Sequence, residues 1–233
     1  MPFDITFEWK PDYTALLISY AYVFGVIGLA ELLRRAGKRS VDFTRKFIHI
    51  GVGMWVVGTV LLFETWYLAM IPPLSFVAIN ALSYLRGSIK AMEVSDRANL
   101  GTIYFPISFA ALIYYFWNQP DLMVASLMPM TWGDAMAAIV GQRYGHYRYS
   151  VRGRTRSLEG SIAMLLWSWV STWLALLIMP FLLGMPLANW LLALLNAGAV
   201  ALVCTVVEAL SPWGLDNLTV PAATALVLQI LFF

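Results

Sequence analysis

The chain has 233 residues, of which 61% are hydrophobic and 12% are charged. A soluble domain is roughly half apolar, so this composition excludes an ordinary soluble protein and indicates one integral membrane domain over residues 1–233. The formal net charge of +2 indicates no particular partner, and the single cysteine, Cys204, excludes an intramolecular disulfide.

Eight apolar runs are candidates for transmembrane helices, each of which needs about 20 residues. In chain order they lie at 13–33, 47–63, 66–85, 101–117, 122–141, 161–183, 187–210 and 218–233. Backbone amides in lipid must be satisfied within their own segment, so the runs are expected to be helical. The predicted fold class is an all-α, polytopic membrane helix bundle.

Positive charges alternate between the connections. All but one of the 15 Lys and Arg residues lie in three stretches, Arg34 to Lys46, Arg86 to Arg97 and Arg143 to Arg156. Cytoplasmic loops carry an excess of Lys and Arg, so these stretches are expected to face the cytoplasm, with the N-terminus outside. The predicted cytoplasmic loops are 34–46, 86–99, 142–160 and 209–217.

Asp134 is an ionisable residue inside the fifth run, where such groups are costly and indicate a functional site. Gly133, Ala137 and Gly141 follow one another at intervals of four. Small residues at this interval share a helix face and let a neighbouring helix approach closely. Asp134 is therefore expected to point into the bundle, as a functional carboxylate or as the structural partner of an arginine.

Two more acidic residues are expected at the depth of Asp134 on the same side of the membrane. Glu208 closes the seventh run, and Asp216 and Asn217 follow it. Mg²⁺ usually takes one or two carboxylates together with phosphate oxygens and water. Asp134, Glu208 and Asp216 are therefore predicted metal ligands, with helix capping as the alternative for Asp216.

The second run begins with "RKFIHIGVG", in which Arg45 and Lys46 precede His49 by four and three residues. Residues at these spacings share a helix face. His49 is a candidate catalytic residue that orients or deprotonates a hydroxyl group. The alternative is a hydrogen-bonded structural histidine.

The arginine-rich connection "QRYGHYRYSVRGRTRS" requires an anionic partner. Lipid headgroups are one candidate, and a nucleotide triphosphate is the other, because arginine forks match phosphate oxygens two at a time. Gly153 would let the backbone come close, and the helix beginning at 157–161 would offer free N–H groups to phosphate. Glu159 could also simply cap that helix. Nucleic acid is not expected, because the basic loops are short and lie at a membrane surface.

Four stretches carry a resemblance to a known family. They are "RKFIHIGVG" (45–53), "GDAMAAIVGQRYG" (133–145), "RTRSLEGS" (154–161) and the closing element with Glu208, Asp216, Asn217 and Pro221. In this order they resemble the dolichol kinase/phytol kinase family of membrane polyprenol kinases, which is more distantly similar to the CDP-diacylglycerol synthases. The resemblance implies transfer of the γ-phosphate of CTP to an isoprenoid alcohol such as phytol, geranylgeraniol or dolichol.

The resemblance also implies roles for individual residues. Asp134 and Asp216 match positions expected to hold Mg²⁺. At Arg156 the chain departs from the family, which usually has lysine there. The residues expected to bind the nucleotide or its phosphates are Arg45, Lys46, Arg154, Arg156, Ser157, Glu159, Gly160, Ser161 and Asn217.

Two other functions remain as alternatives. A CDP-lipid synthase would use the same metal and nucleotide, but those enzymes carry a G-H-G-G element before D-R-x-D, where this chain has "SPWGLDN". A small membrane transporter would place polar groups near the bilayer midplane, whereas the ionisable groups here gather on one leaflet. The length of the alcohol and the oligomeric state stay open.

Overall fold

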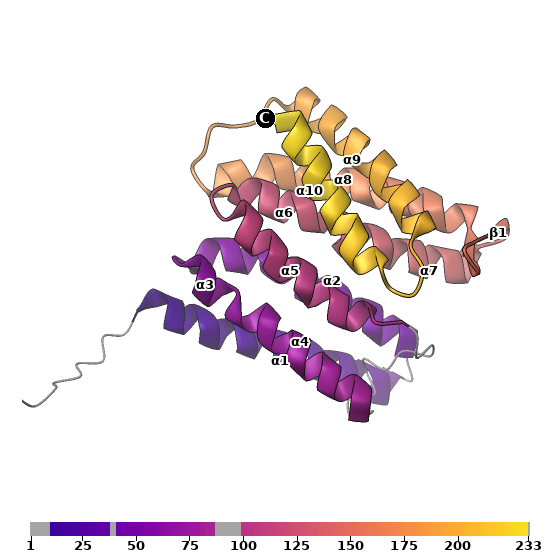
Figure 1. Cartoon of the computed structure of the whole chain (residues 1–233), viewed down its shortest axis with the longest axis horizontal. Coiled ribbons are helices and arrows are strands. Elements are labelled where there is room, and N and C mark those ends of the chain that lie inside the picture. Colours follow the sequence, from indigo (N-terminus) through magenta and orange to yellow (C-terminus); the bar gives the residue numbers. More distant parts are fainter. Residues whose placement is uncertain (1–9, 38–40, 87–98, 233) are drawn as a thin grey trace, which may run out of the picture.

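The computed structural model describes residues 10–37, 41–86 and 99–232. Within these ranges the protein is a bundle of helices with one β-hairpin (Figure 1). The elements are α1 (Pro11–Gly37), α2 (Val41–Leu62), α3 (Trp66–Ala69), α4 (Ile71–Arg86), α5 (Gly101–Phe116), α6 (Pro120–Met128), η2 (Pro129–Asp134), α7 (Ala135–Tyr144), β1 (Arg148–Val151), β2 (Arg154–Ser157), α8 (Leu158–Leu182), α9 (Trp190–Leu210) and α10 (Asp216–Phe232).

The predicted all-α polytopic membrane bundle is confirmed. Among the described residues, 6 helical segments are long and apolar enough to cross a membrane: Pro11–Gly37, Val41–Leu62, Trp66–Arg86, Pro120–Tyr144, Leu158–Leu182 and Trp190–Leu210. The two other predicted runs form α5 and α10, with 16 and 17 residues. At 1.5 Å per residue these two helices are about 25 Å long, which is shorter than the roughly 30 Å hydrocarbon core.

Two predicted loops contain regular structure instead. The helix α2 begins at Val41 rather than at 47, so Arg45 and Lys46 lie on a helix and not in a loop. The predicted loop 142–160 contains the antiparallel hairpin of β1 and β2. Its turn residues, Arg152 and Gly153, have φ angles of 48° and 75°, and positive φ at both positions is what a tight two-residue hairpin turn requires. The predicted loop 86–99 lies almost wholly outside the described residues.

The helix that carries Asp134 is interrupted by the π-helical segment η2, between α6 and α7. Pro129, the first residue of η2, has no N–H group and cannot make the usual α-helical hydrogen bond. Asp134 is the last residue of this segment, so it lies where the helix returns to α geometry. Such π-helical turns occur frequently at functional sites.

The predicted small-residue face of this helix is present, and its neighbour is α8. A Cβ atom added to Gly160 would lie 2.9 Å from the carbonyl oxygen of Ala137. One added to Gly141 would lie 3.0 Å from Ser157 Oγ, and one added to Gly133 would lie 2.8 Å from Met164 Sδ. Only glycine at these positions allows the two helices to approach this closely.

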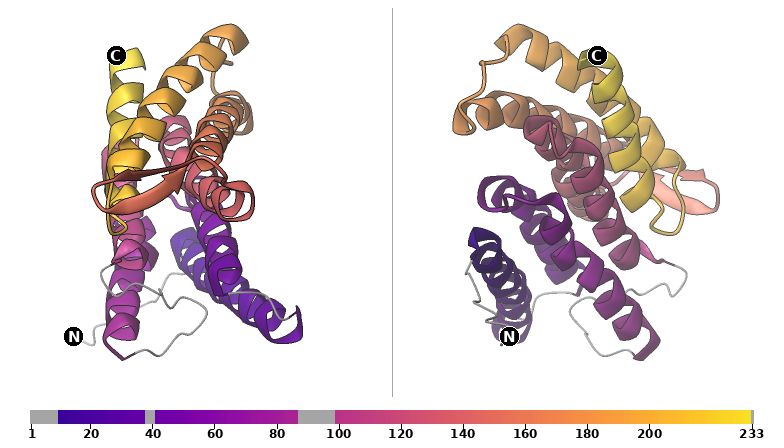
Figure 2. Two further views of the ribbon diagram at one scale, coloured as in Figure 1. Left: turned by 90° about the vertical axis from the view of Figure 1, so that its right-hand side faces the viewer. Right: turned by 60° about the vertical axis from the view of Figure 1, so that its left-hand side comes forward.

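Elements from the first and the last parts of the chain meet at one end of the molecule. The helices α1 and α2 pack together, α5 contacts both α4 and α10, and α6 contacts both α2 and α8. The end of α7, the hairpin and the α9–α10 connection lie on the same side as the start of α2 (Figure 1). Figure 2 shows the hairpin lying across this end, between α7 and α10. Among the described residues, the start of α2 and the hairpin, which carry two of the predicted basic segments, therefore lie at the same end, while their cytoplasmic orientation stays a prediction.

Asp12 connects the start of α1 to the α2–α3 connection. Its side chain is 1% exposed, and it accepts hydrogen bonds from the Glu64 backbone N–H at 2.8 Å and from Thr65 Oγ1 at 2.7 Å. Because Asp12→Ala would leave these donors without their acceptor, it should destabilise the protein by about 1–3 kcal/mol. The measurement is the melting temperature in detergent.

Glu64→Ala is the matched control for Asp12→Ala. The Glu64 side chain is exposed and its backbone N–H is retained in the variant, so its melting temperature should stay at the wild-type value. Equal melting temperatures for Asp12→Ala and wild type would contradict the role assigned to Asp12.

Candidate active site

Three carboxylates from three separate helical elements converge at the hairpin end of the bundle. Asp134 ends η2, Glu208 lies in the last turn of α9, and Asp216 begins α10. Each offers one oxygen, and these oxygens lie within 4.8 Å of one another. Asp134 is 8% exposed and Glu208 is 3% exposed. The structure thus brings together all three predicted metal ligands, which we call the acid cluster.

Lys46 and Arg156 form ion pairs with the acid cluster. Lys46 Nζ lies 2.6 Å from Asp134 Oδ2. Arg156 forms an ion pair with Glu208 Oε1 and lies 3.9 Å from Asp216 Oδ2. Buried carboxylates are costly unless they are paired with cations or coordinate a metal ion, and these two ion pairs provide part of that compensation.

The acid cluster fits a divalent metal ion. Carboxylate oxygens are the hard donors that Mg²⁺ prefers, and opposite ligands of an octahedral Mg²⁺ ion stand about 4 Å apart. The spacing of up to 4.8 Å between the three oxygens is close to that separation. Asp134, Glu208 and Asp216 are the residues that would hold the ion.

Arg156 also anchors the hairpin to the α9–α10 connection. Its Nη2 donates hydrogen bonds to the carbonyl oxygens of Glu208 at 2.6 Å and Ser211 at 2.9 Å. One guanidinium therefore contacts two carbonyl groups and two carboxylates. A lysine, with its single nitrogen, could not make all of these contacts.

Asn217 fixes the position of Asp216. Its Nδ2 donates to Asp216 Oδ1 at 2.9 Å and to the Gly214 carbonyl oxygen at 3.2 Å. The backbone carbonyl oxygen of Asn217 accepts a hydrogen bond from Ser108 Oγ of α5 at 2.6 Å. The contact with the nucleotide that the sequence predicts for Asn217 stays a prediction, and the contacts present orient a carboxylate of the acid cluster.

His49 contacts the π-helical segment. Its Nε2 lies 2.8 Å from the Met130 carbonyl oxygen and 3.7 Å from Asp134 Oδ2. A carbonyl oxygen only accepts hydrogen bonds, so Nε2 carries a hydrogen in this arrangement. If His49 takes a proton from a substrate, Nδ1 is therefore the nitrogen that receives it. Arg45 lies one helical turn away, 3.9 Å from Asp42 Oδ1.

Of the residues at the start of α8 that are predicted to bind the nucleotide, some line a polar cavity and one, Glu159, does not. Ser157 and Gly160 line a polar cavity, and Ser157 Oγ accepts the Gly160 N–H at 3.1 Å as the N-cap of α8. Ser161 lines the same cavity, and its hydroxyl lies 2.6 Å from that of Tyr149.

Glu159 lies outside that polar cavity. Its Oε1 accepts backbone hydrogen bonds from His146 at 3.0 Å and Tyr147 at 3.2 Å. These contacts hold the entry to the hairpin against the start of α8. The contact with the nucleotide predicted for Glu159 stays untested, and its observed contacts are structural.

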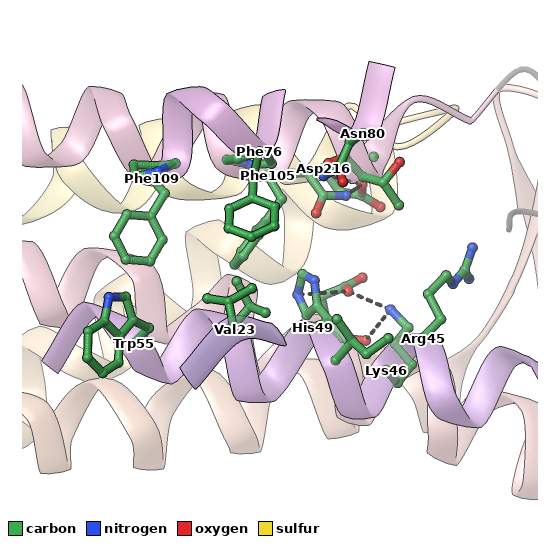
Figure 3. Close-up of a pocket in the computed structure, with 18 of the residues that line it drawn as sticks. Val23, Arg45, Lys46, His49, Trp55, Phe76, Asn80, Phe105, Phe109 and Asp216 are labelled. Carbon is green, nitrogen blue, oxygen red and sulfur yellow. Dashed lines mark hydrogen bonds and ion pairs between the residues drawn. The ribbon is translucent and has the colours of Figure 1, made fainter. Parts of the chain in front are cut away.

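Two cavities of opposite character meet at the acid cluster. The polar cavity, of about 510 Å³, is lined by Asp134, Ala137, Ala138, Gly141, Gln142, Arg148, Gly153, Arg154, Thr155, Arg156, Ser157, Gly160, Ser161, Glu208 and Asp216. The apolar cavity, of about 240 Å³, extends from Arg45, Lys46 and His49 into a mainly aromatic and aliphatic lining (Figure 3). Asp134, Ala138, Arg154 and Asp216 line both.

The part of the apolar cavity away from its polar end was not predicted from the sequence. Its lining includes Trp55, Phe76, Asn80, Phe105 and Phe109. Apolar side chains in an apolar run carry no signal that separates cavity from core. Asn80 could have been found, because it is a polar residue inside the third apolar run. Its Nδ2 donates to the Thr102 carbonyl oxygen at 2.7 Å and so connects α4 to α5.

Comparison with known proteins identifies relatives along most of the chain. It is 32% identical to the phytol kinase of Synechocystis sp. over 219 residues, which cover 93% of this chain and 91% of that protein. It is 30% identical to phytol kinase 1, chloroplastic, of Arabidopsis thaliana, covering 91% of this chain and 75% of that protein. It is 26% identical to the farnesol kinase, chloroplastic, of Arabidopsis thaliana, covering 66% of this chain and 53% of that protein.

No family model matches the chain, and no solved structure matches it significantly. The distant similarity to the CDP-diacylglycerol synthases stays a prediction. The identity to the Synechocystis protein extends over nearly the full length of both chains, and it agrees with the resemblance of the four ordered motifs. The chain therefore belongs to the phytol kinase family of membrane polyprenol kinases.

Proposed function

We propose that the chain is a membrane lipid kinase that transfers the γ-phosphate of CTP to an isoprenoid alcohol, such as phytol, geranylgeraniol or another polyprenol, at the cytoplasmic interface. The observation that carries this proposal is the meeting of a polar and an apolar cavity at the acid cluster. An isoprenoid alcohol has a polar hydroxyl and an apolar tail, and it needs both kinds of surface at one point. The relatives named phytol kinase and farnesol kinase support this substrate class.

The polar cavity receives the nucleotide in this proposal. Arg148, Arg154 and Arg156 line it, and arginine forks match phosphate oxygens two at a time. The choice of CTP rests on the resemblance to polyprenol kinases. The alcohol enters from the bilayer, with its tail in the apolar cavity and its hydroxyl beside His49 and the acid cluster.

Phosphoryl transfer depends on positioning and on neutralising charge more than on covalent help from the protein. Mg²⁺ held by Asp134, Glu208 and Asp216 would supply charge neutralisation at the phosphates. Lys46 holds the Asp134 carboxylate in the site through their contact of 2.6 Å. His49 orients the alcohol through Nδ1, and a general base is optional in a loose transition state.

The direct test follows the phosphate. Purified protein in lipid would be given Mg²⁺, phytol or geranylgeraniol, and CTP labelled at the α or the γ position. Label should enter the lipid from the γ position only, because a kinase transfers the terminal phosphoryl group. ATP labelled at the γ position, supplied in parallel, tests the preference for CTP.

Other outcomes of this test would identify the alternatives. Entry of α label with added phosphatidate would mean a CDP-lipid synthase, and the kinase proposal would be wrong. If no label enters lipid from CTP or from ATP, and neither nucleotide with Mg²⁺ changes the melting temperature, the site does not bind these nucleotides. A transporter for an unrelated solute would then be favoured.

Asp134→Asn should lower kcat by at least about 100-fold, because the variant loses both a metal ligand and the partner of Lys46. Initial rates would be measured at saturating Mg²⁺ and CTP. Asp121→Asn is the matched control, since Asp121 lies in the first turn of α6, in the same membrane-spanning segment Pro120–Tyr144 but outside the acid cluster. Near wild-type turnover of Asp134→Asn would refute its role as a metal ligand.

Arg156→Lys should lower kcat/KM for CTP by about tenfold, because the ammonium group cannot replace the contacts that the guanidinium makes with two carbonyl groups and two carboxylates. Arg152→Lys, at the exposed turn of the hairpin, should be neutral. Lysine is the usual residue of the family at position 156. Full activity of Arg156→Lys would therefore mean that one ion pair with Glu208 suffices.

A further inference from the structure

The apolar cavity has a polar end and an aromatic end. Arg45, Lys46 and Asp216 lie at one end of the close-up, and Trp55 and Phe109 lie at the other (Figure 3). Phe76 and Phe105 lie between the two ends (Figure 3). A chain that enters with its hydroxyl at the acid cluster therefore extends toward Trp55 and Phe109.

The indole of Trp55 is fixed in place from α1. Its Nε1 donates a hydrogen bond to Ser19 Oγ at 3.1 Å. Its ring stacks on that of Tyr22, with 4.7 Å between centroids, and the Tyr22 hydroxyl donates to the Gly51 carbonyl oxygen at 2.9 Å. A ring held by both a hydrogen bond and a stacking contact presents a defined surface to the cavity.

A glycine on α2 makes room for this ring position. A Cβ atom added to Gly58 would lie 2.6 Å from Trp55 Cζ3. Phe109, on α5, is 4% exposed and packs in the hydrophobic core. The aromatic end of the cavity is therefore built from two elements, and neither ring is free to move aside without repacking.

Helix geometry gives the reach of the cavity. Lys46 and Trp55 are nine positions apart on α2, which corresponds to about 13–14 Å along the axis. An extended carbon chain advances roughly 1.2 Å per bond, so an isoprenoid unit of four chain bonds advances about 5 Å. Between the acid cluster and Trp55 there is room for about two to three extended isoprenoid units.

We infer that Trp55 and Phe109 form an end wall that limits how much of the isoprenoid chain the cavity encloses. The inference rests on the proposed function and adds the determinant of chain length. Geraniol, with two isoprenoid units, ends short of the wall. Geranylgeraniol and phytol, with four, meet the wall and must bend away from it.

The test compares alcohols of increasing length in mixed micelles. For Trp55→Ala, kcat/KM should rise about tenfold for geranylgeraniol and phytol, because removal of the indole extends the cavity. The value for geraniol should stay at the wild-type level, since its tail does not reach the wall. Trp55→Phe is a milder change. Its value of kcat/KM for geranylgeraniol divided by that for geraniol should also rise, by a smaller factor than in Trp55→Ala.

Trp173→Ala is the matched control. Trp173 is also partly buried and its Nε1 also donates a hydrogen bond, to the Trp190 carbonyl oxygen at 3.2 Å. It lies on α8, outside both cavities. Trp173→Ala should leave the ratio of kcat/KM for geranylgeraniol to kcat/KM for geraniol unchanged, even if the variant protein is less stable.

The outcomes separate the inference from the proposed function. If wild type phosphorylates the alcohols but both Trp55 variants keep the wild-type ratio, the end wall is refuted and the kinase proposal stands. If wild type phosphorylates no isoprenoid alcohol with any nucleotide, the proposed function fails and the inference fails with it. A rise in the ratio for the Trp55 variants but not for Trp173→Ala supports the end wall.

Discussion

The acid cluster is the constraint on which the rest of the structure depends. Three carboxylates with oxygens within 4.8 Å of one another repel one another and lose much of their hydration, so they require cationic partners. Lys46 comes from α2 and Arg156 comes from β2. Each of these ion pairs joins segments distant in sequence. The compensation of buried charge therefore fixes where α2 meets η2 and where the hairpin meets α9 and α10.

The two cavities follow from the same arrangement. Where α7, α8 and the hairpin approach the acid cluster, arginines and small residues leave a polar cavity. Where α1, α2, α4 and α5 approach it, aromatic and aliphatic side chains leave an apolar one. A site of this kind handles a molecule that is polar at one end and lipid-like along the rest. The proposed kinase activity uses both cavities at once.

Sequence reasoning recovered the features that contrast with an apolar background. Asp134 and Glu208 could be recognised because a carboxylate in an apolar run is rare and costly. Lys46 and Asp216 were predicted beside such runs, and the four residues are found together. The hairpin was missed, because two four-residue strands rich in arginine resemble a polar loop. The π-helical segment and the aromatic end of the cavity were missed because their residues differ little from the surrounding apolar ones.

One face of α2 connects the chemistry to the length of the substrate. Lys46, His49, Val52 and Trp55 follow one another at intervals of three, and all of them line the apolar cavity. The first contacts Asp134, the second contacts Met130 in η2, and the last stacks on Tyr22 of α1. Because one rigid helix carries both the polar end and the aromatic end, the distance between them is set by its rise per residue. A change in the packing of α1 against α2 would therefore alter the aromatic end, while the acid cluster, whose carboxylates come from η2, α9 and α10 and pair with Arg156 of β2, keeps its geometry.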